Sequence, residues 1–406
     1  MAACARLGTS YCDITGETPW VHNMIEKYGE EAKKSGAVLV SLCGMDSVPA
    51  DMGTYFLVRE MRKRELLPTS VLAGISAKGG VSGGTIASGI NLIESTDKSL
   101  RKHLRNPFAM IQDDEKRRAQ VGGSASGAKA SDSGSKRPGS RSSEETSSAG
   151  PASLDGVLVA PTDAALPGWE PALQAYGAPF IMAPVNIRVV LRSAALAAGL
   201  GAAHRYSPSG TPFDYSERMQ TSSLLTALAV AGGTGAAVAG LVIPCTRWCL
   251  KRYLPKSGDG PDFDTMKNGF LCYTFVAEAA RAVGPEAGEA SSGAGASGAA
   301  PGRVFATLTA DGDPGYFLTA QMLGQCALAL AQDGDSIPGR ALHGGGYLTP
   351  SAAFGDMLLD RLTEHAGFNF EYHGEERPKK FRSSPADMLG RLGLEAEIEK
   401  KGAKKE

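Results

Sequence analysis

The stretch that decides the fold is AVLVSLCGMDSVPAD, residues 37–51. Its first six residues form a short, β-branched apolar run, which is typical of a strand covered on both faces in a parallel sheet. Asp46 and Ser47 then precede Pro49, and this order predicts the start of a helix that continues to Arg64. A buried strand that passes directly into a helix indicates α/β architecture.

The segments on either side alternate strands and helices. The further predicted elements are a strand at 7–14, a helix at 19–36, a strand at 71–76, a helix at 86–105, a hairpin of strands at 270–279 and 304–309, and helices at 319–331 and 350–365. We therefore expect an α/β fold, in which a partial Rossmann-type parallel sheet is followed by an α+β domain with an antiparallel sheet.

Composition suggests how the chain is divided. Two stretches dominated by Gly, Ser and Ala can bury no core, so we expect both to be disordered insertions. The expected organisation is an amino-terminal part at 1–70, a second domain at 71–117 and 154–373 with an apolar block at 220–253, disordered insertions at 118–153 and 284–302, and a tail at 374–406.

Charge and cysteine usage exclude two classes of protein. Lys and Arg number 42 against 43 Asp and Glu, and a net charge of -1 does not favour a nucleic-acid partner. The seven cysteines show no paired CxxC spacing, so no metal site is expected, and buried free thiols in a reducing compartment are the better interpretation. The amino terminus has no apolar segment of the kind found in signal peptides.

Four ordered motifs carry a family resemblance. Residues 8–17 (GTSYCDITGE), 43–51 (CGMDSVPAD), 82–88 (SGGTIAS) and the late DPGY and LTP elements at 313–316 and 348–350 resemble blocks of the saccharopine dehydrogenase-like oxidoreductases. That group is similar to the mycobacterial trans-acting enoyl reductases. The blocks span about residues 8–370. The resemblance implies that residues 1–70 are the remnant of a Rossmann nucleotide-binding domain, and that the second domain, at 71–117 and 154–373, is a substrate domain.

The resemblance implies a nicotinamide cofactor, NAD or NADP, held by a glycine-rich turn between a first strand and a first helix. No such turn occurs near the amino terminus, and the partial match at Gly233 and Gly235 is better interpreted as close helix packing. We therefore expect the loop upstream of Met1, the chain to be amino-terminally truncated, and dinucleotide binding by this chain alone to be weak.

Polar residues follow the first two predicted parallel strands, at the edge where α/β sheets bind ligands. The candidate cofactor-binding residues are Asp13, Thr15 and Glu17 after the first strand, and Asp46 and Ser47 after the second. The alternative is that Asp13 and Glu17 fix a loop, while Asp46 and Ser47 cap a helix.

No catalytic residue is assigned from the sequence. Hydride transfer needs no nucleophile, because the cofactor carries the chemistry and the protein supplies orientation and a proton. Tyr11 and Tyr316 are candidate proton donors, and buried tyrosines satisfied by structural hydrogen bonds are the alternative. The implied function is NAD(P)-dependent reduction in lipid or glycolipid metabolism. A non-catalytic lipid-droplet or membrane-associated protein is the alternative.

The apolar block has no charged residue between Arg218 and Arg247, and its centre, 224–245, is long enough to cross a bilayer. Trp248 and nearby bases are typical of an interfacial anchor. A buried core helix and a full span are two alternatives, and a membrane-surface or lipid-droplet hairpin, which the family resemblance implies, is the third. We expect attachment on the cytoplasmic face through about 220–253. The expected partners are a lipid surface or membrane and a lipid-like small-molecule substrate, with a homodimer as a candidate assembly.

Overall fold

A computed structural model of the chain describes residues 1–80, 106–113, 115, 166–208, 211–243, 245–248, 260–281 and 302–378, together with short strands at 153–154 and 158–159. The predicted helix at 86–105 and nearly all of the two expected insertions lie outside the described residues, as does the tail beyond 378. The described part combines helices with a parallel sheet and a mostly antiparallel sheet, so the predicted α/β class is confirmed.

The parallel sheet has three strands, in the order β1-β2-β11. They are β1 (Tyr11–Cys12), β2 (Val38–Val40) and β11 (Gly346–Leu348). Leu39 in the central strand is aligned with Tyr11 on one side and with Tyr347 on the other. All three residues of β2 are fully buried, which confirms the strand covered on both faces that the apolar run predicted.

The first predicted strand is shorter than expected. Residues 7–14 were expected to be extended, but α1 (Ala2–Leu7) occupies the start and β1 contains only two residues. Gly8 ends α1 in the left-handed region with φ 73°, a conformation that glycine adopts without strain. The next helix, α2 (Thr18–Ser35), begins with Pro19 in its first turn and ends at Gly36, as predicted.

The second sheet contains seven strands, and only the β3–β8 pair is parallel. In spatial order they are β12 (Asn369–Gly374), β10 (Arg303–Asp311), β9 (Phe270–Arg281), β3 (Leu66–Lys78), β8 (Asp214–Thr221), β7 (Ala175–Ala178) and β6 (Gly168–Glu170). The antiparallel pairing of β9 with β10 confirms the predicted hairpin. A separate two-stranded pair joins β4 (Ser153–Leu154) and β5 (Leu158–Val159).

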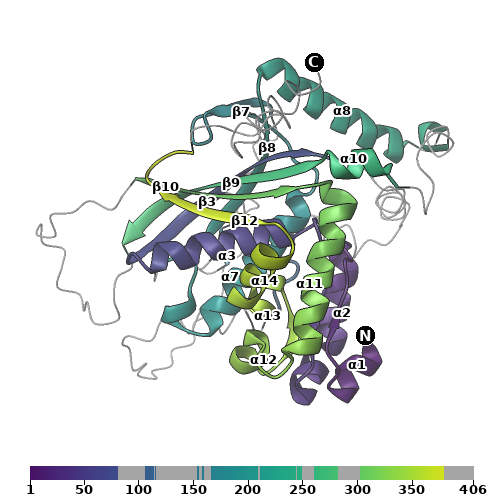
Figure 1. Cartoon of the computed structure of the whole chain (residues 1–406), viewed down its shortest axis with the longest axis vertical. Coiled ribbons are helices and arrows are strands. Elements are labelled where there is room, and N and C mark those ends of the chain that lie inside the picture. Colours follow the sequence, from purple (N-terminus) through teal and green to yellow (C-terminus); the bar gives the residue numbers. More distant parts are fainter. Residues whose placement is uncertain are drawn as a thin grey trace, which may run out of the picture.

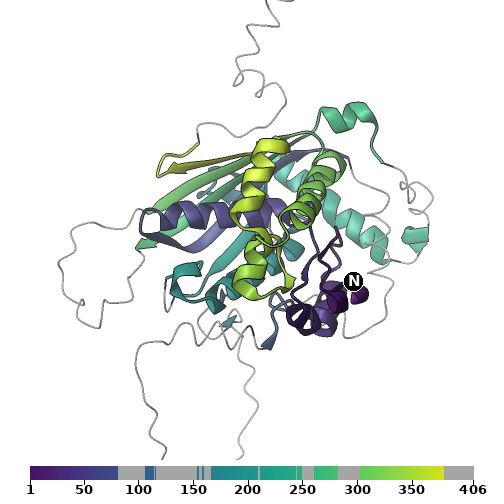
Figure 2. The same cartoon turned by 60° about the horizontal axis from the view of Figure 1, so that its bottom comes forward.

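Helices cover one face of the large sheet, with α3 (Val48–Arg62) and α7 (Ala183–Gly199) packed directly against its strands (Figure 1). The turned view in Figure 2 shows α3 between the strands and the carboxyl-terminal helices. Close approach is possible at Gly53, because a Cβ there would lie 2.2 Å from Cζ of Phe275.

The carboxyl-terminal helices are η2 (Pro314–Leu318), a π-helical turn, α11 (Thr319–Gln332), α12 (Pro338–His343), α13 (Pro350–Phe354) and α14 (Asp356–His365). The predicted single helix at 350–365 is therefore two helices. They are separated at Gly355, which has φ 50° and ψ −133° and approaches the Tyr55 hydroxyl. The apolar side-chain pattern continues across this break, because the break depends only on a backbone conformation at Gly355 that glycine adopts without strain.

The apolar block forms α8 (Leu224–Val242), which lies on the side of the large sheet away from α3 (Figure 1). Among the described residues it is the one helix long and apolar enough to cross a membrane. Leu225 is 78% exposed and Leu228 is 51% exposed, while Ala227 is buried against the protein. The helix is thus not the buried core helix that was one of the alternatives. Two shorter helical segments are η1 (Ala202–His204) and α10 (Phe263–Lys267).

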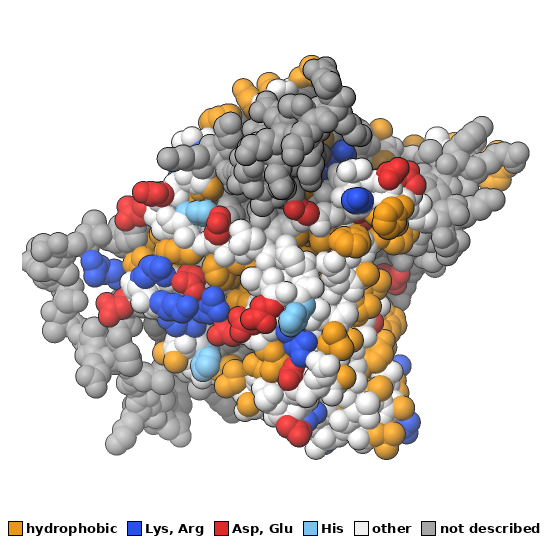
Figure 3. Space-filling view, in the orientation of Figure 1, with side chains coloured by type: hydrophobic (Ala, Val, Ile, Leu, Met, Phe, Trp, Pro, Cys, Tyr) orange, Lys and Arg blue, Asp and Glu red, His pale blue; other side chains and the backbone are white. Residues whose placement is uncertain are grey.

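Acidic and basic side chains lie next to one another beside α3, rather than forming one patch of a single charge sign (Figure 3). Arg59, for example, pairs with both Asp356 and Glu60.

Candidate functional site

The segments that follow β1 and β2 meet at the carboxyl edge of the parallel sheet. The backbone N–H of Cys43 donates to the carbonyl oxygen of Asp13 at 2.9 Å, and that of Asp13 donates to Val40 at 3.0 Å. The Asp13 carboxylate in turn accepts a hydrogen bond from the backbone N–H of Thr15 at 2.9 Å. Its second oxygen, Oδ2, is buried without a hydrogen-bond partner among the described residues.

Asp46 lies directly against this first segment. A Cβ placed on Gly16 would be 2.3 Å from Oδ2 of Asp46, so only glycine allows the two loops to approach this closely. Glu17 is the residue before α2, but its side chain makes no capping hydrogen bond. The structure thus brings together four of the predicted site residues, Asp13, Thr15, Glu17 and Asp46, on two adjoining loops.

The late DPGY motif closes the same region from the other side. The backbone N–H of Met45 donates to Oγ1 of Thr319 at 3.0 Å. Asp313 is fully buried, and its carboxylate accepts hydrogen bonds from the backbone N–H groups of Gly80 and Tyr316, each at 2.6 Å. Motifs more than 250 residues apart in sequence therefore form one structural unit.

Ser47 occupies the position before α3, yet its side chain caps no helix amide. Its hydroxyl instead donates to Oδ1 of Asn186 at 3.3 Å. The prediction that this side chain caps the helix was therefore wrong, because a buried amide on α7 competes for the hydroxyl.

Asn186 continues the chain of hydrogen bonds into the core. Its Nδ2 donates to Oε2 of Glu217 at 2.9 Å and to Oε1 at 3.2 Å, and the Tyr215 hydroxyl donates to Oε1 at 2.7 Å. Sequence reasoning missed Asn186 and Glu217. Glu217 had one available signal, because the period of two in β8 places it on the same inward face as Tyr215.

Burial shifts the acid–base properties of these groups. Desolvation raises the pKa of Asp46 to about 6. Desolvation also raises the pKa of Glu217 to about 7, although the hydrogen bonds from Tyr215 and Asn186 act in the opposite direction. The pKa of Tyr11 is raised to about 12 by burial and by the neighbouring Asp13 carboxylate. Carboxyl groups whose pKa is raised by burial occur often at functional sites.

The second aspartate of the CGMDSVPAD motif has a structural position. Asp51 is fully buried, and it accepts hydrogen bonds from the Ser193 hydroxyl at 2.6 Å and from the backbone N–H and hydroxyl of Ser351 at 2.8 and 2.9 Å. These bonds join α3 to α7 and to the LTP element. The motif residue thus holds the three segments that support the site.

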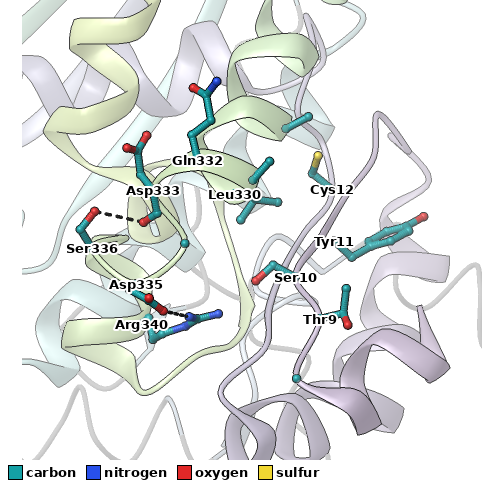
Figure 4. Close-up of a pocket in the computed structure, with 14 residues that line it drawn as sticks. Thr9, Ser10, Tyr11, Cys12, Leu330, Gln332, Asp333, Asp335, Ser336 and Arg340 are labelled. Atoms are coloured by element: carbon teal, nitrogen blue, oxygen red, sulfur yellow. Dashed lines mark hydrogen bonds and ion pairs between the residues drawn. The ribbon is translucent and has the colours of Figure 1, made fainter.

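A cavity of about 730 Å³ lies beside the outer edge of β1 (Figure 4). Ser10 and Cys12 line it from the strand, and the end of α11 with Asp333, Asp335 and Arg340 closes the opposite side. Tyr11 points away from it (Figure 4). None of the five predicted cofactor-binding residues lines this cavity.

No group of three or more His, Cys, Asp or Glu side chains in the described part of the chain is arranged to hold a metal ion. The two candidate proton donors have structural contacts in view. Tyr11 lies beside Asp13, and Tyr316 donates its backbone N–H to Asp313.

The fold and this edge define an α/β protein of the kind that binds ligands where parallel strands end. The chain is 35% identical over 379 residues to a Mycobacterium tuberculosis protein that carries the name of a trans-acting enoyl reductase, covering 89% of this chain and 74% of that protein. It is 30% identical over 378 residues to a Mycobacterium bovis trans-acting enoyl reductase, with the same coverage. A Mycobacterium ulcerans relative of that name is 29% identical, covering 90% and 74%.

This chain belongs to the family of the trans-acting enoyl reductases. No family model and no solved structure matches it.

Proposed function

We propose that this protein is an NAD(P)H-dependent oxidoreductase that reduces a carbon–carbon double bond or carbonyl of a lipid-like acyl substrate. The observation that carries the proposal is the convergence of the 13–17, 43–47 and 313–319 segments at the carboxyl edge of the parallel sheet. The names of the relatives support the reaction class. The motif blocks support a relation to the saccharopine dehydrogenase-like oxidoreductases as part of the same proposal.

The residues at this edge fit the nicotinamide–ribose half of the cofactor. The buried Oδ2 of Asp13 has no hydrogen-bond partner of normal geometry among the described residues, although the Tyr11 hydroxyl lies near this carboxylate. Oδ2 would accept from a donor of the cofactor such as a ribose hydroxyl or a carboxamide N–H. When bound, the cofactor would supply a hydride. Asp13 would accept from the cofactor, Thr15 and Glu17 would border the ribose, and Asp46 and Ser47 would lie on the substrate side.

Binding is best tested by saturation-transfer NMR with NADPH and NADH, because this method detects the weak affinity that we expect. The nicotinamide and adjoining ribose protons should receive most of the saturation. Asp13→Ala should reduce their signal severalfold, because the unpaired acceptor is lost. Asp335→Ala is the matched control, since Asp335 is an exposed carboxylate on the separate cavity. An unchanged signal in Asp13→Ala, or transfer through the adenine alone, would contradict the proposed site.

The reaction class is tested separately by oxidation of NADPH in the presence of a long-chain trans-2-enoyl thioester. Product formation should require the nicotinamide cofactor and the enoyl group. If the protein binds NADPH but consumes neither NADPH nor the thioester, the result would favour the second candidate function.

That second candidate is attachment to a lipid surface, and the exposure of α8 favours it. Large apolar side chains are between 43% and 78% exposed on α8, which has no charged residue, and just after it: Leu224, Leu225, Leu228 and Trp248. Exposed apolar patches of this kind mark membrane or protein contacts. We propose that α8 lies in the headgroup boundary of a membrane or lipid droplet, facing the cytosol, where Trp248 would occupy the polar interface.

Liposome flotation tests this attachment. The double variant Leu225→Glu/Leu228→Glu should remain folded and lose flotation, because both side chains are exposed in the free protein. Leu166→Glu is the control, since Leu166 is 80% exposed but lies outside α8. Equal flotation of the double variant and the control would argue against attachment through this helix.

A further inference from the structure

Glu217 is an ionisable group that no cation neutralises. Its side chain is 6% exposed, and its hydrogen-bond partners are Asn186 and Tyr215. No Lys, Arg or His among the described residues pairs with it. A buried carboxyl without a cation favours its neutral form, because desolvation penalises the charge. Glu217 can therefore gain or lose a proton under ordinary solution conditions.

Its surroundings contain few other titratable groups. Tyr215 on the same strand and Tyr273 on β9 face it, and Thr54 on α3 approaches Tyr215. Asp46 acts on Tyr273 from the loop before α3. The Tyr273 hydroxyl is buried, has no hydrogen-bond partner of normal geometry among the described residues, and lies near the Asn186 amide. Both tyrosines have a pKa raised by burial, so Glu217 titrates before either of them, whereas Asp46, whose pKa is raised to about 6, titrates at lower pH than Glu217.

The hydrogen-bond directions in this chain depend on one another. An ionised carboxylate only accepts, so Asn186 must present its NH₂ to Glu217 and its carbonyl oxygen to Ser47. Ser47 must then donate. A protonated Glu217 can donate to the amide oxygen instead, which requires the amide to turn. Asn186 would then donate to Ser47 Oγ, and the Ser47 O–H would no longer donate to Asn186.

We propose that Glu217 is a positioning residue for the candidate site, and that its protonation sets the direction of hydrogen bonding through Asn186 to Ser47. The relay ends on the residue that precedes α3, beside the Asp46 that contacts Gly16. When the amide turns, Ser47 changes from donating a hydrogen bond to Asn186 to accepting one from it. This exchange changes how the 43–47 loop is held. This inference rests on the proposed function only for its effect on ligand binding, because the relay is a property of the protein itself.

The test uses the full chain labelled with ¹⁵N at asparagine, followed by NMR across about two pH units on either side of pH 7. The side-chain amide signals of Asn186, assigned through their loss in Asn186→Ser, should shift with a midpoint near pH 7. In Glu217→Gln they should stay fixed, because the glutamine amide does not titrate. Glu278→Gln is the matched control, since Glu278 is about half exposed on β9, and it should leave the titration unchanged.

NADPH binding supplies the second readout. The step in wild-type affinity with a midpoint near pH 7 should be about fivefold, as expected for one hydrogen bond of about 1 kcal/mol. Glu217→Gln should remove this step and leave any separate change near pH 6 that comes from Asp46. If Asn186 does not titrate, or titrates unchanged in Glu217→Gln, the relay is wrong. If NADPH binds at no pH, the proposed function fails, while the Asn186 titration still decides the relay.

Discussion

Replacing Asp51 with asparagine should mainly change how the free energy of unfolding depends on pH. Burial raises the pKa of this carboxyl from 3.8 to about 6, even though Ser193 and Ser351 donate hydrogen bonds to it. Because the folded-state pKa is above the unfolded one, the stabilising contribution is fully present below pH 3.8 and is lost as the pH rises through about 6. The shift corresponds to about 3 kcal/mol.

The asparagine would lose one favourable contact at every pH. Its oxygen can still accept from the hydroxyls of Ser193 and Ser351, but its NH₂ would face the backbone N–H of Ser351. Two opposed donors in a buried position cost about 1–3 kcal/mol. The asparagine has no charge to bury, however, so it does not share the loss of stability that the wild type undergoes as the pH rises.

Asp51→Asn should therefore be less stable than the wild type by about 1–3 kcal/mol near pH 4. Near pH 7 the difference should move by about 3 kcal/mol in favour of the variant. Urea unfolding of both proteins at a series of pH values measures this change. Asp356→Asn is the control, because that carboxylate is exposed, and it should show a small difference at all pH values. A constant difference between Asp51→Asn and wild type across the series would refute the reasoning.

Two further comparisons test the packing and the buried ion pair. Gly53→Ala should destabilise the protein by about 1–3 kcal/mol, because the new methyl would overlap the Phe275 ring. Gly324→Ala, in open space on α11, should stabilise it by up to about 1 kcal/mol. Equal denaturant midpoints for the two variants would contradict this packing. Arg192→Leu should lower the free energy of unfolding by about 3–5 kcal/mol in the same assay, because it leaves the buried Glu115 carboxylate without its cation. The double variant Arg192→Leu/Glu115→Leu should recover most of that loss.

Sequence periodicity was sufficient for the elements that bury a simple apolar face. The run at 37–42 predicted β2, and the two apolar segments around 275 and 306 predicted the hairpin. It could not predict β11, since three residues beginning with glycine carry no recognisable strand pattern. The burial of that strand comes from its partner β2 and from Arg192, which donates to the carbonyl oxygen of Tyr347.

The candidate site was predictable only in part, for a similar reason. Residues that follow parallel strands can be located from sequence, so the contact between Gly16 and Asp46 was within reach. Asn186 and Glu217 come from other elements, and only the tertiary fold brings them to Ser47. For α8, an uncharged apolar helix has the same composition whether it is covered or exposed, so only the structure could separate these alternatives.

The pairing of β2 with β11 also determines the order in which the protein can assemble during synthesis. Leu39 leaves the ribosome long before Tyr347, yet the two are neighbours in one three-stranded sheet, and Ser41 and Tyr347 share a hydrogen bond across 306 positions. The amino-terminal segment must therefore wait with one side of β2 uncovered while most of the chain is made. Such a delay leaves one edge of a β-branched apolar strand open to pairing with other nascent chains until the segment around 347 arrives.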